Sequence, residues 1–171
     1  MTENKVSAVL AFVALAALIA HAQIVSMAQS RPIVKTDAVT YLFPEQVSVS
    51  AGKASAVALH FRVAQGLHIN SNKPLAEFLI PTTLSIPEGM GVRLEKADYP
   101  AGTVISLAFD PKTKLSVYTG EFAIQARIVA TAGNHLVQAR LRYQACDNNQ
   151  CMPPKTINVP IDVIGTTASG H

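Results

Sequence analysis

Alternation of bulky apolar residues with polar or small ones, sustained over several segments, is the feature that most constrains the fold of this chain. From Val57 to Val63, bulky apolar residues occupy every second position, with Ala58, His60 and Arg62 between them. Because successive side chains of a β-strand point to opposite faces of a sheet, this pattern predicts a strand with one buried face and one solvated face. The same alternation extends over residues 122–128, 137–145 and 157–163.

Shorter candidate strands complete the pattern. They cover residues 46–50, 82–86, 92–95, 103–109 and 115–118, and turns rich in Gly and Pro separate them. No segment after residue 22 keeps the period of an amphipathic helix over three turns. The sequence therefore predicts an all-β fold, an immunoglobulin-like antiparallel β-sandwich over residues 46–165. Pro160 has no N–H for a sheet ladder, so we expect the strand at 157–163 to form an edge.

The first 22 residues follow a different pattern, that of a secretory signal peptide. A weakly positive start with Lys5 precedes an apolar run, Val6–Ala20, and Ala20-His21-Ala22 places small residues before a possible cut. A second candidate cut follows Ala28. The alternative is an uncleaved membrane anchor, but an apolar helix of this length spans roughly 22 Å, less than the ~30 Å hydrocarbon core. We therefore expect export.

Composition narrows the function classes for the rest of the chain. A net charge of +3 is too small to indicate a nucleic-acid partner, and two cysteines exclude a four-cysteine zinc site. Neither a phosphate-binding loop nor a nucleophile elbow is present in the sequence. We expect a flexible lead-in over residues 23–45 and a flexible tail over residues 166–171. We expect no cofactor, no metal and no small-molecule substrate.

The two cysteines, Cys146 and Cys151, flank a four-residue polar loop between two predicted strands. Such a loop can double back and bring two Cα atoms to the roughly 5.5 Å that a disulfide needs. One interpretation is a structural staple, which would contribute only about 2 kcal/mol in so small a ring. A domain of this size can bury a sufficient core without it.

The other interpretation is a reversible dithiol and disulfide. Pro153 and Pro154 fix an extended backbone after Cys151, and Met152, which precedes a proline, is also pushed into an extended conformation. This exposes Cys151 where another protein could approach, and exposed disulfides in short loops are the labile ones. A third alternative is a soft-metal site, because thiolate and thioether ligands suit Cu(I); its ligands would be Cys146, Cys151, Met152 and His68.

From Tyr143 to Pro154 the chain follows the pattern Tyr-Gln-x-Cys-x4-Cys-x-Pro-Pro. This pattern resembles the active-site segment of the N-terminal periplasmic domains of the thiol:disulfide interchange protein DsbD. Residues 66–74, Gly-Leu-His-Ile-Asn-Ser-Asn-Lys-Pro, also resemble a stretch common in such domains. The similarity covers Val47 to Val163.

The resemblance implies an immunoglobulin-like, periplasmic domain that relays electrons. In the family, a transmembrane domain reduces the cysteine pair, and the pair then reduces periplasmic disulfide isomerases and other thiol–disulfide oxidoreductases. Carried over to this chain, Cys151 forms the mixed disulfide with the partner and Cys146 resolves it. Because the sequence stops at His171, we expect the electron donor to be a separate membrane-embedded protein.

The resemblance also implies a cap loop that shields the sulfurs with an aromatic residue. The matching segment is residues 116–120, with Tyr118 as the shield and Val117 beside it. Better-known members carry acidic residues in the cap, whereas Lys112 and Lys114 precede it here. We expect Tyr143 to support the cysteine loop from beneath, together with His68, Pro153 and Pro154.

Three functions therefore stay open on the residues alone. The first is a thiol–disulfide interchange domain, a component of a protein-disulfide reductase. The second is a non-catalytic immunoglobulin-like binding module with a structural Cys146–Cys151 disulfide. The third is a copper-handling domain.

Overall fold

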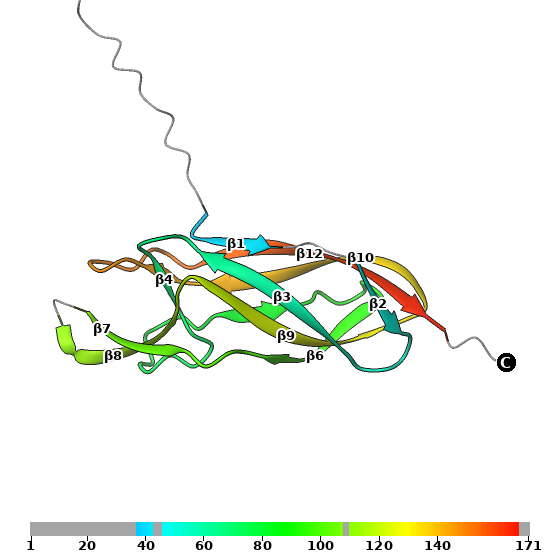
Figure 1. The fold of residues 1–171 in the computed structure, drawn as a ribbon, viewed down its shortest axis with the longest axis horizontal. Helices are drawn as coiled ribbons and strands as arrows, with labels where there is room; N and C mark the ends of the chain where they lie inside the picture. Colours follow the sequence, from blue (N-terminus) through cyan, green and yellow to red (C-terminus); the bar gives the residue numbers. More distant parts are fainter. Residues whose placement is uncertain (1–36, 43–45, 108–109, 168–171) are drawn as a thin grey trace, which may run out of the picture. The chain divides into compact units, whose positions relative to one another are not determined.

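The computed structural model describes residues 37–42, 46–107 and 110–167, and the regular elements in this part of the chain are strands (Figure 1). The expected signal peptide lies outside these residues. In the described part, no helix is long and apolar enough to cross a membrane. The strands are β1 Val39–Leu42, β2 Gln46–Ser50, β3 Ser55–Val63, β4 His68–Asn70, β5 Thr83–Ser85, β6 Val92–Asp98, β7 Thr103–Leu107, β8 Asp110–Tyr118, β9 Glu121–Ala130, β10 Gly133–Tyr143, β11 Ala145–Cys146 and β12 Lys155–Thr166.

The first sheet has the strand order β1-β3-β9-β6, and all its pairings are antiparallel. Its centre is the pairing of β3 with β9, in which Leu59 lies opposite Ile124 and Phe61 lies opposite Phe122. The rings of Phe61 and Phe122 stack with their centroids 5.4 Å apart. These are the alternating segments that the sequence predicts as strands.

The second sheet has the order β2-β12-β10-β5, with β10 and β12 paired antiparallel along their length. β2 pairs in parallel with residues 162–166 of β12. The expectation that this last strand forms an edge is therefore wrong for its second half. Pro160 lies just before that half, opposite Gln138 of β10. Because β2 pairs only with residues 162–166, the absence of an N–H at Pro160 removes no hydrogen bond between β12 and β2.

The two sheets enclose one hydrophobic core, built from the inward residues of each alternating strand. Burying an aliphatic or aromatic side chain completely contributes about 1.5–3 kcal/mol, so this core is the main source of stability. The prediction of an all-β, immunoglobulin-like sandwich is confirmed, with one parallel pair in an otherwise antiparallel arrangement. Core residues at most 1% exposed include Leu59, Phe61, Ile124 and Ile128 of the first sheet and Val137, Leu141, Val159 and Ile161 of the second.

A third sheet, which the sequence did not predict, has the order β11-β4-β8-β7. Figure 1 shows β4, β7 and β8 together at one end of the sandwich. β4 is the link, since it pairs with β11 on one side and with β8 on the other. A small separate core of Leu79, Leu115 and Val117 lies against this sheet.

The segment between β4 and β5 forms a loop whose two ends are tied together. The Thr82 amide donates to the Ser71 carbonyl at 3.1 Å, and the Thr82 hydroxyl donates to the Asn70 carbonyl at 2.5 Å. Leu79, within the loop, packs into the small core, while Phe78 is 75% exposed. The loop therefore covers part of the third sheet.

The structured domain begins earlier than the sequence predicts. The expected flexible lead-in, residues 23–45, is wrong for residues 39–42, because these form β1 and pair with β3. Val39 is 1% exposed and belongs to the main core. At the other end Thr166 is the last residue of β12, and its hydroxyl donates to the Val49 carbonyl at 3.1 Å. The expected tail therefore starts after Thr166, and residues 168–171 lie outside the described part.

Candidate functional site

The two cysteines form a disulfide at the end of the third sheet. The S–S distance is 2.07 Å, and the Cα atoms of Cys146 and Cys151 are 4.0 Å apart. Cys146 ends β11, and an isolated antiparallel bridge joins it to Cys151. The Met152 amide donates to the Ala145 carbonyl at 2.8 Å, so the chain returns directly alongside β11. The polar loop thus doubles back as the sequence suggested.

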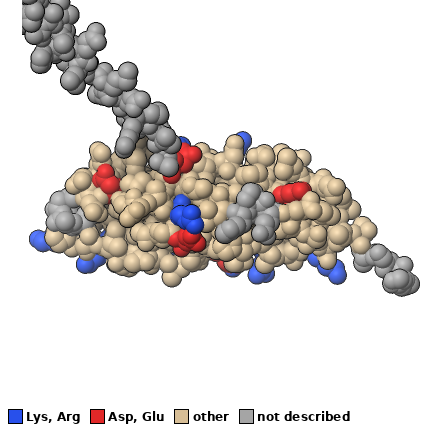
Figure 2. All heavy atoms as spheres, turned by 45° about the horizontal axis from the view of Figure 1, so that its top comes forward, with Lys and Arg blue, Asp and Glu red and all other residues tan. Residues whose placement is uncertain are grey.

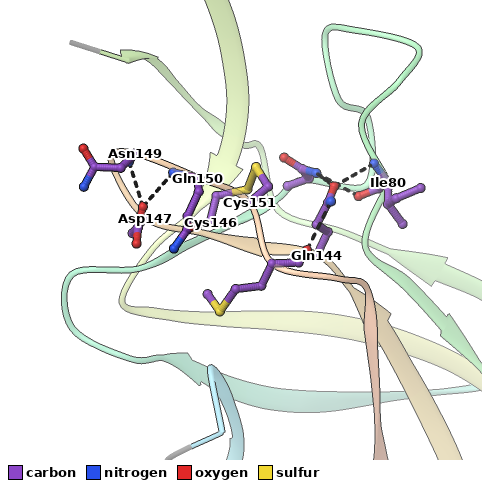
Figure 3. The surroundings of a disulfide bond; sticks show 9 residues. Ile80, Gln144, Cys146, Asp147, Asn149, Gln150 and Cys151 are labelled. Atoms are coloured by element: carbon purple, nitrogen blue, oxygen red, sulfur yellow. Dashed lines mark hydrogen bonds between the residues drawn. A yellow bond between two sulfur atoms is a disulfide. The ribbon is translucent and has the colours of Figure 1, made fainter. Parts of the chain in front are cut away.

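Asp147 fixes the conformation of this loop. Its Oδ1 atom accepts hydrogen bonds from the Asn149 amide at 2.7 Å and the Gln150 amide at 2.8 Å (Figure 3). The Asp147 amide in turn donates to the Gln150 carbonyl at 3.0 Å. The two amide donors lower the pKa of the Asp147 carboxyl, because they stabilise its charged form. The loop is therefore held by a carboxylate that stays ionised at neutral pH.

The two cysteines differ in their exposure to solvent. Cys146 is 1% exposed, whereas Cys151 is an exposed residue. Pro153 and Pro154 are exposed as well, and Met152 is half-buried and packs against the main core. Of the two cysteines, Cys151 is the one that another protein can reach.

His68 lies directly opposite Cys146 in the antiparallel pairing of β4 with β11. It is 4% exposed, and its Nε2 atom is buried without a hydrogen-bond partner among the described residues. Burial lowers the pKa of His68, because desolvation disfavours the imidazolium form, and the nearby Asp147 carboxylate opposes this effect in part. The imidazole beside the disulfide is therefore neutral at pH 7.

Tyr118 and Val117, the expected cap, form the end of β8 and are 4% and 0% exposed. Tyr118 lies opposite Ile69 of β4, and its ring stacks on Phe122 with the centroids 4.8 Å apart. Its hydroxyl donates to Asn72 Oδ1 at 2.7 Å, and burial raises the pKa of Tyr118. The segment is a strand through Tyr118 rather than a loop, and shielding of the sulfurs by Tyr118 stays a prediction.

Tyr143, expected beneath the cysteine loop, ends β10 and is 1% exposed. It belongs to the main core, and burial raises the pKa of its hydroxyl. Met152 packs against the same core. The structure therefore places Tyr143 on the inward face of its strand, and its support of the loop stays a prediction.

Gln144 was not identified from the sequence as a residue of the site. Its side-chain oxygen accepts from the Ile80 amide at 3.3 Å and from Asn70 Nδ2 at 3.1 Å, and its Nε2 donates to the Met152 carbonyl at 3.3 Å (Figure 3). One side chain thus joins β4, the loop between β4 and β5, and the residue after Cys151. The cysteine motif contains this glutamine, but the alternation of β10 assigns it to the solvated face.

Charged groups and possible metal ligands are dispersed over the domain. On the face shown in Figure 2, Lys, Arg, Asp and Glu side chains are scattered, with no large field of one sign. Exposed ion pairs such as Arg62–Glu121 and Arg93–Glu95 join neighbouring charges. Within the described ranges, no three His, Cys, Asp or Glu side chains gather as a metal site would require.

The immunoglobulin-like sandwich carries one disulfide, and Cys151 is exposed at the end of the short loop that follows β11. These are features of a thiol–disulfide interchange domain. The chain belongs to the family described as thiol:disulfide interchange protein DsbD, N-terminal, whose profile matches residues 38–162. The family predicted from the cysteine motif is thereby confirmed. The match also includes β1, which the sequence analysis left outside the domain.

Several solved structures are similar to this chain, among them two distant matches. One is the reduced DsbD N-terminal domain of Neisseria meningitidis, with 20% identity, a TM-score of 0.46, and coverage of 67% of this chain and 82% of that one. The other is the N-terminal periplasmic domain of ScsB from Proteus mirabilis, with 15% identity, a TM-score of 0.47, and coverage of 72% of this chain and 44% of that one. No curated protein matches the chain.

Proposed function

We propose that this chain is an exported thiol–disulfide interchange domain that passes reducing equivalents to other periplasmic thiol–disulfide oxidoreductases or isomerases. The observation that carries the proposal is the asymmetry of the disulfide, with Cys151 exposed and Cys146 1% exposed. Membership of the DsbD N-terminal family supports thiol–disulfide interchange as the chemistry. Export rests on the signal-peptide pattern of residues 1–22.

The exposed cysteine acts first in this proposal. With both cysteines reduced, the Cys151 thiolate attacks one sulfur of a partner disulfide and forms a mixed disulfide, and the other partner sulfur leaves as a thiolate. The Cys146 thiolate then attacks the Cys151 sulfur. The Cys146–Cys151 disulfide forms, the partner leaves with both sulfurs reduced, and two electrons have passed to the partner.

The loop geometry makes the second attack intramolecular. Asp147 holds the loop through two backbone amides, and the Cα atoms of the two cysteines are 4.0 Å apart. A resolving thiol fixed beside the mixed disulfide gains from proximity, which raises its effective concentration far above that of a free thiol. An electron donor then returns the cysteines to the dithiol form. Pro153 and Pro154 are proposed to flank the sulfurs. Tyr118 lies opposite Ile69, on the other face of the third sheet from His68 and Cys146, so a shield from β8 would come from Val117, which lies opposite Asn70.

Trapping with single-cysteine variants tests this proposal. Cys146→Ala leaves Cys151 able to attack a partner but removes the thiol that resolves the mixed disulfide, so disulfide-linked complexes should accumulate in the periplasm. Cys151→Ala is the matched control and should trap none, because its one remaining cysteine is buried. Equal yields of linked partners from the two variants, or none from either, would contradict the relay and favour a binding module with a structural disulfide.

A further inference from the structure

The proposed function assigns no chemical role to the imidazole of His68, which lies beside the disulfide. Cross-strand neighbours in an antiparallel pair project to the same face of the sheet with Cβ atoms about 4.5–5.5 Å apart. The pairing of His68 with Cys146 therefore places the imidazole beside the buried cysteine. The Nε2 atom of His68 is buried with no hydrogen-bond partner in the described part of the chain, an arrangement that is normally unfavourable.

The resolving step needs a base that removes the proton from the Cys146 thiol. The nucleophile in disulfide exchange is the thiolate, and burial in apolar surroundings makes a thiol harder to deprotonate. Cys146 is 1% exposed, so bulk water has little access to its proton. A neutral imidazole nitrogen can accept that proton directly.

Two titratable groups on the neighbouring elements bear on the state of His68 in the described part of the chain. The Asp147 carboxylate, in the loop after β11, is the charge that acts on the imidazole. On the other side of β4, Tyr118 of β8 lies opposite Ile69, so its side chain projects to the opposite face from that of His68. Asp147 favours the imidazolium form and so helps His68 hold a proton once it has accepted one.

Resting on the proposed function, we infer that His68 is the proton acceptor for the Cys146 thiol when Cys146 resolves the mixed disulfide. The Cys146 proton moves to Nε2 of His68, and the resulting thiolate attacks the Cys151 sulfur. The bond between Cys151 and the partner breaks, and the partner sulfur leaves with the electron pair. His68 then releases its proton to the departing thiolate or to water, so that the imidazole is neutral again.

Ellman's reagent, an aromatic disulfide that releases a coloured thiolate, separates the two attacks on the reduced full chain. The attack by Cys151 releases one equivalent at a rate that depends on reagent concentration. Resolution by Cys146 releases a second equivalent at a rate independent of that concentration. A Cys146→Ala variant should release the first equivalent only, which assigns the two phases.

His68→Gln should slow the second phase at pH 7 by about tenfold or more and leave the first phase unchanged, since general bases contribute about 10²–10⁴-fold. The deficit should shrink as the pH rises into the alkaline range, because hydroxide can then remove the thiol proton without help from His68. His60→Gln, at an exposed position of β3, is the matched control and should behave as wild type. A second phase in His68→Gln with the wild-type rate and pH profile would overturn the role of His68.

Failure of the proposed function gives a different result in the same experiment. A reduced wild-type protein that releases no second equivalent would overturn both proposals, because no resolving step would then exist. Titration of the His68 imidazole by NMR provides a second test that does not depend on the folding of His68→Gln. In a Cys151→Ser variant, which leaves the Cys146 thiol free, His68 and Cys146 should titrate as a coupled pair. Independent titration of the two groups would contradict the inference.

Discussion

Cys146 and Cys151 share one disulfide, yet the first is 1% exposed and the second is exposed to solvent. The difference comes from their positions, since Cys146 belongs to β11, which pairs with β4, and Cys151 lies past the loop that Asp147 holds. A structural staple needs no such asymmetry. A dithiol that attacks a partner with one sulfur and resolves with the other requires it.

Removing the disulfide should leave the fold intact. The ring closed by Cys146 and Cys151 is small, so its loss should lower the free energy of unfolding by about 2 kcal/mol. The core between the first two sheets does not depend on it. Urea unfolding of the Cys146→Ala/Cys151→Ala variant measures the change, with reduced wild type as the control. Loss of the folded state in the variant would show that the bond is a structural staple.

Asp147 should tune the stability of the disulfide relative to the dithiol. Asp147→Ala removes both hydrogen bonds to the loop amides, which lets the reduced cysteines separate and makes the disulfide easier to reduce. We expect the reduction potential to rise by up to about 30 mV, a tenfold change in the equilibrium constant. Asp147→Asn keeps an oxygen acceptor and should shift the potential less. Equal shifts for the two variants, measured in glutathione buffers, would show that the hydrogen bonds are not the cause.

Gln144 should be needed to hold the site together. Gln144→Leu leaves the Ile80 amide and the Met152 carbonyl without their side-chain partner, which should cost about 1–3 kcal/mol. Gln138→Leu, at a half-buried glutamine of β10, is the matched control and should cost less. Chemical denaturation of both variants measures the difference. A Gln144→Leu protein as stable as Gln138→Leu would contradict the role given to this side chain.

Stability should fall at mildly acidic pH because of His68. Burial lowers its pKa in the folded state below the ordinary value of 6.5, so the unfolded chain binds the proton more readily. The contribution is complete above about pH 6.5 and is lost as the pH falls from there through the lowered pKa of the folded protein. Unfolding curves at neutral and mildly acidic pH should show a smaller loss in His68→Gln than in wild type. An identical loss in both would indicate that His68 does not titrate abnormally.

Local pattern was sufficient to predict the long central strands of the two main sheets. Strands β3, β9, β10 and β12 alternate strictly, and the residues that alternation assigns to the inner face, Phe61 and Leu141 among them, are fully buried. The alternation does not reveal whether two paired strands run parallel or antiparallel, because a strand that runs parallel to its neighbour alternates in the same way. For this reason the parallel pairing of β2 with β12 was not predicted.

The third sheet was missed for a related reason. β4 and β11 are three and two residues long, too short for any period to show, and they exist as strands only through pairing with each other and with β8. The cysteine motif located the disulfide, but the partners of Cys146 come from distant parts of the chain. His68 and Gln144 therefore acquire their roles from tertiary pairing, which a single sequence does not display.

Reduction of the folded protein by dithiothreitol tests the central claim most directly. Oxidised wild type is treated with millimolar dithiothreitol without denaturant, free thiols are counted by alkylation, and circular dichroism follows the fold. We predict that the Cys146–Cys151 disulfide is reduced, re-forms when an oxidant is added, and leaves the β-sheet spectrum unchanged throughout. A disulfide that stays intact until the protein is unfolded would contradict a redox function.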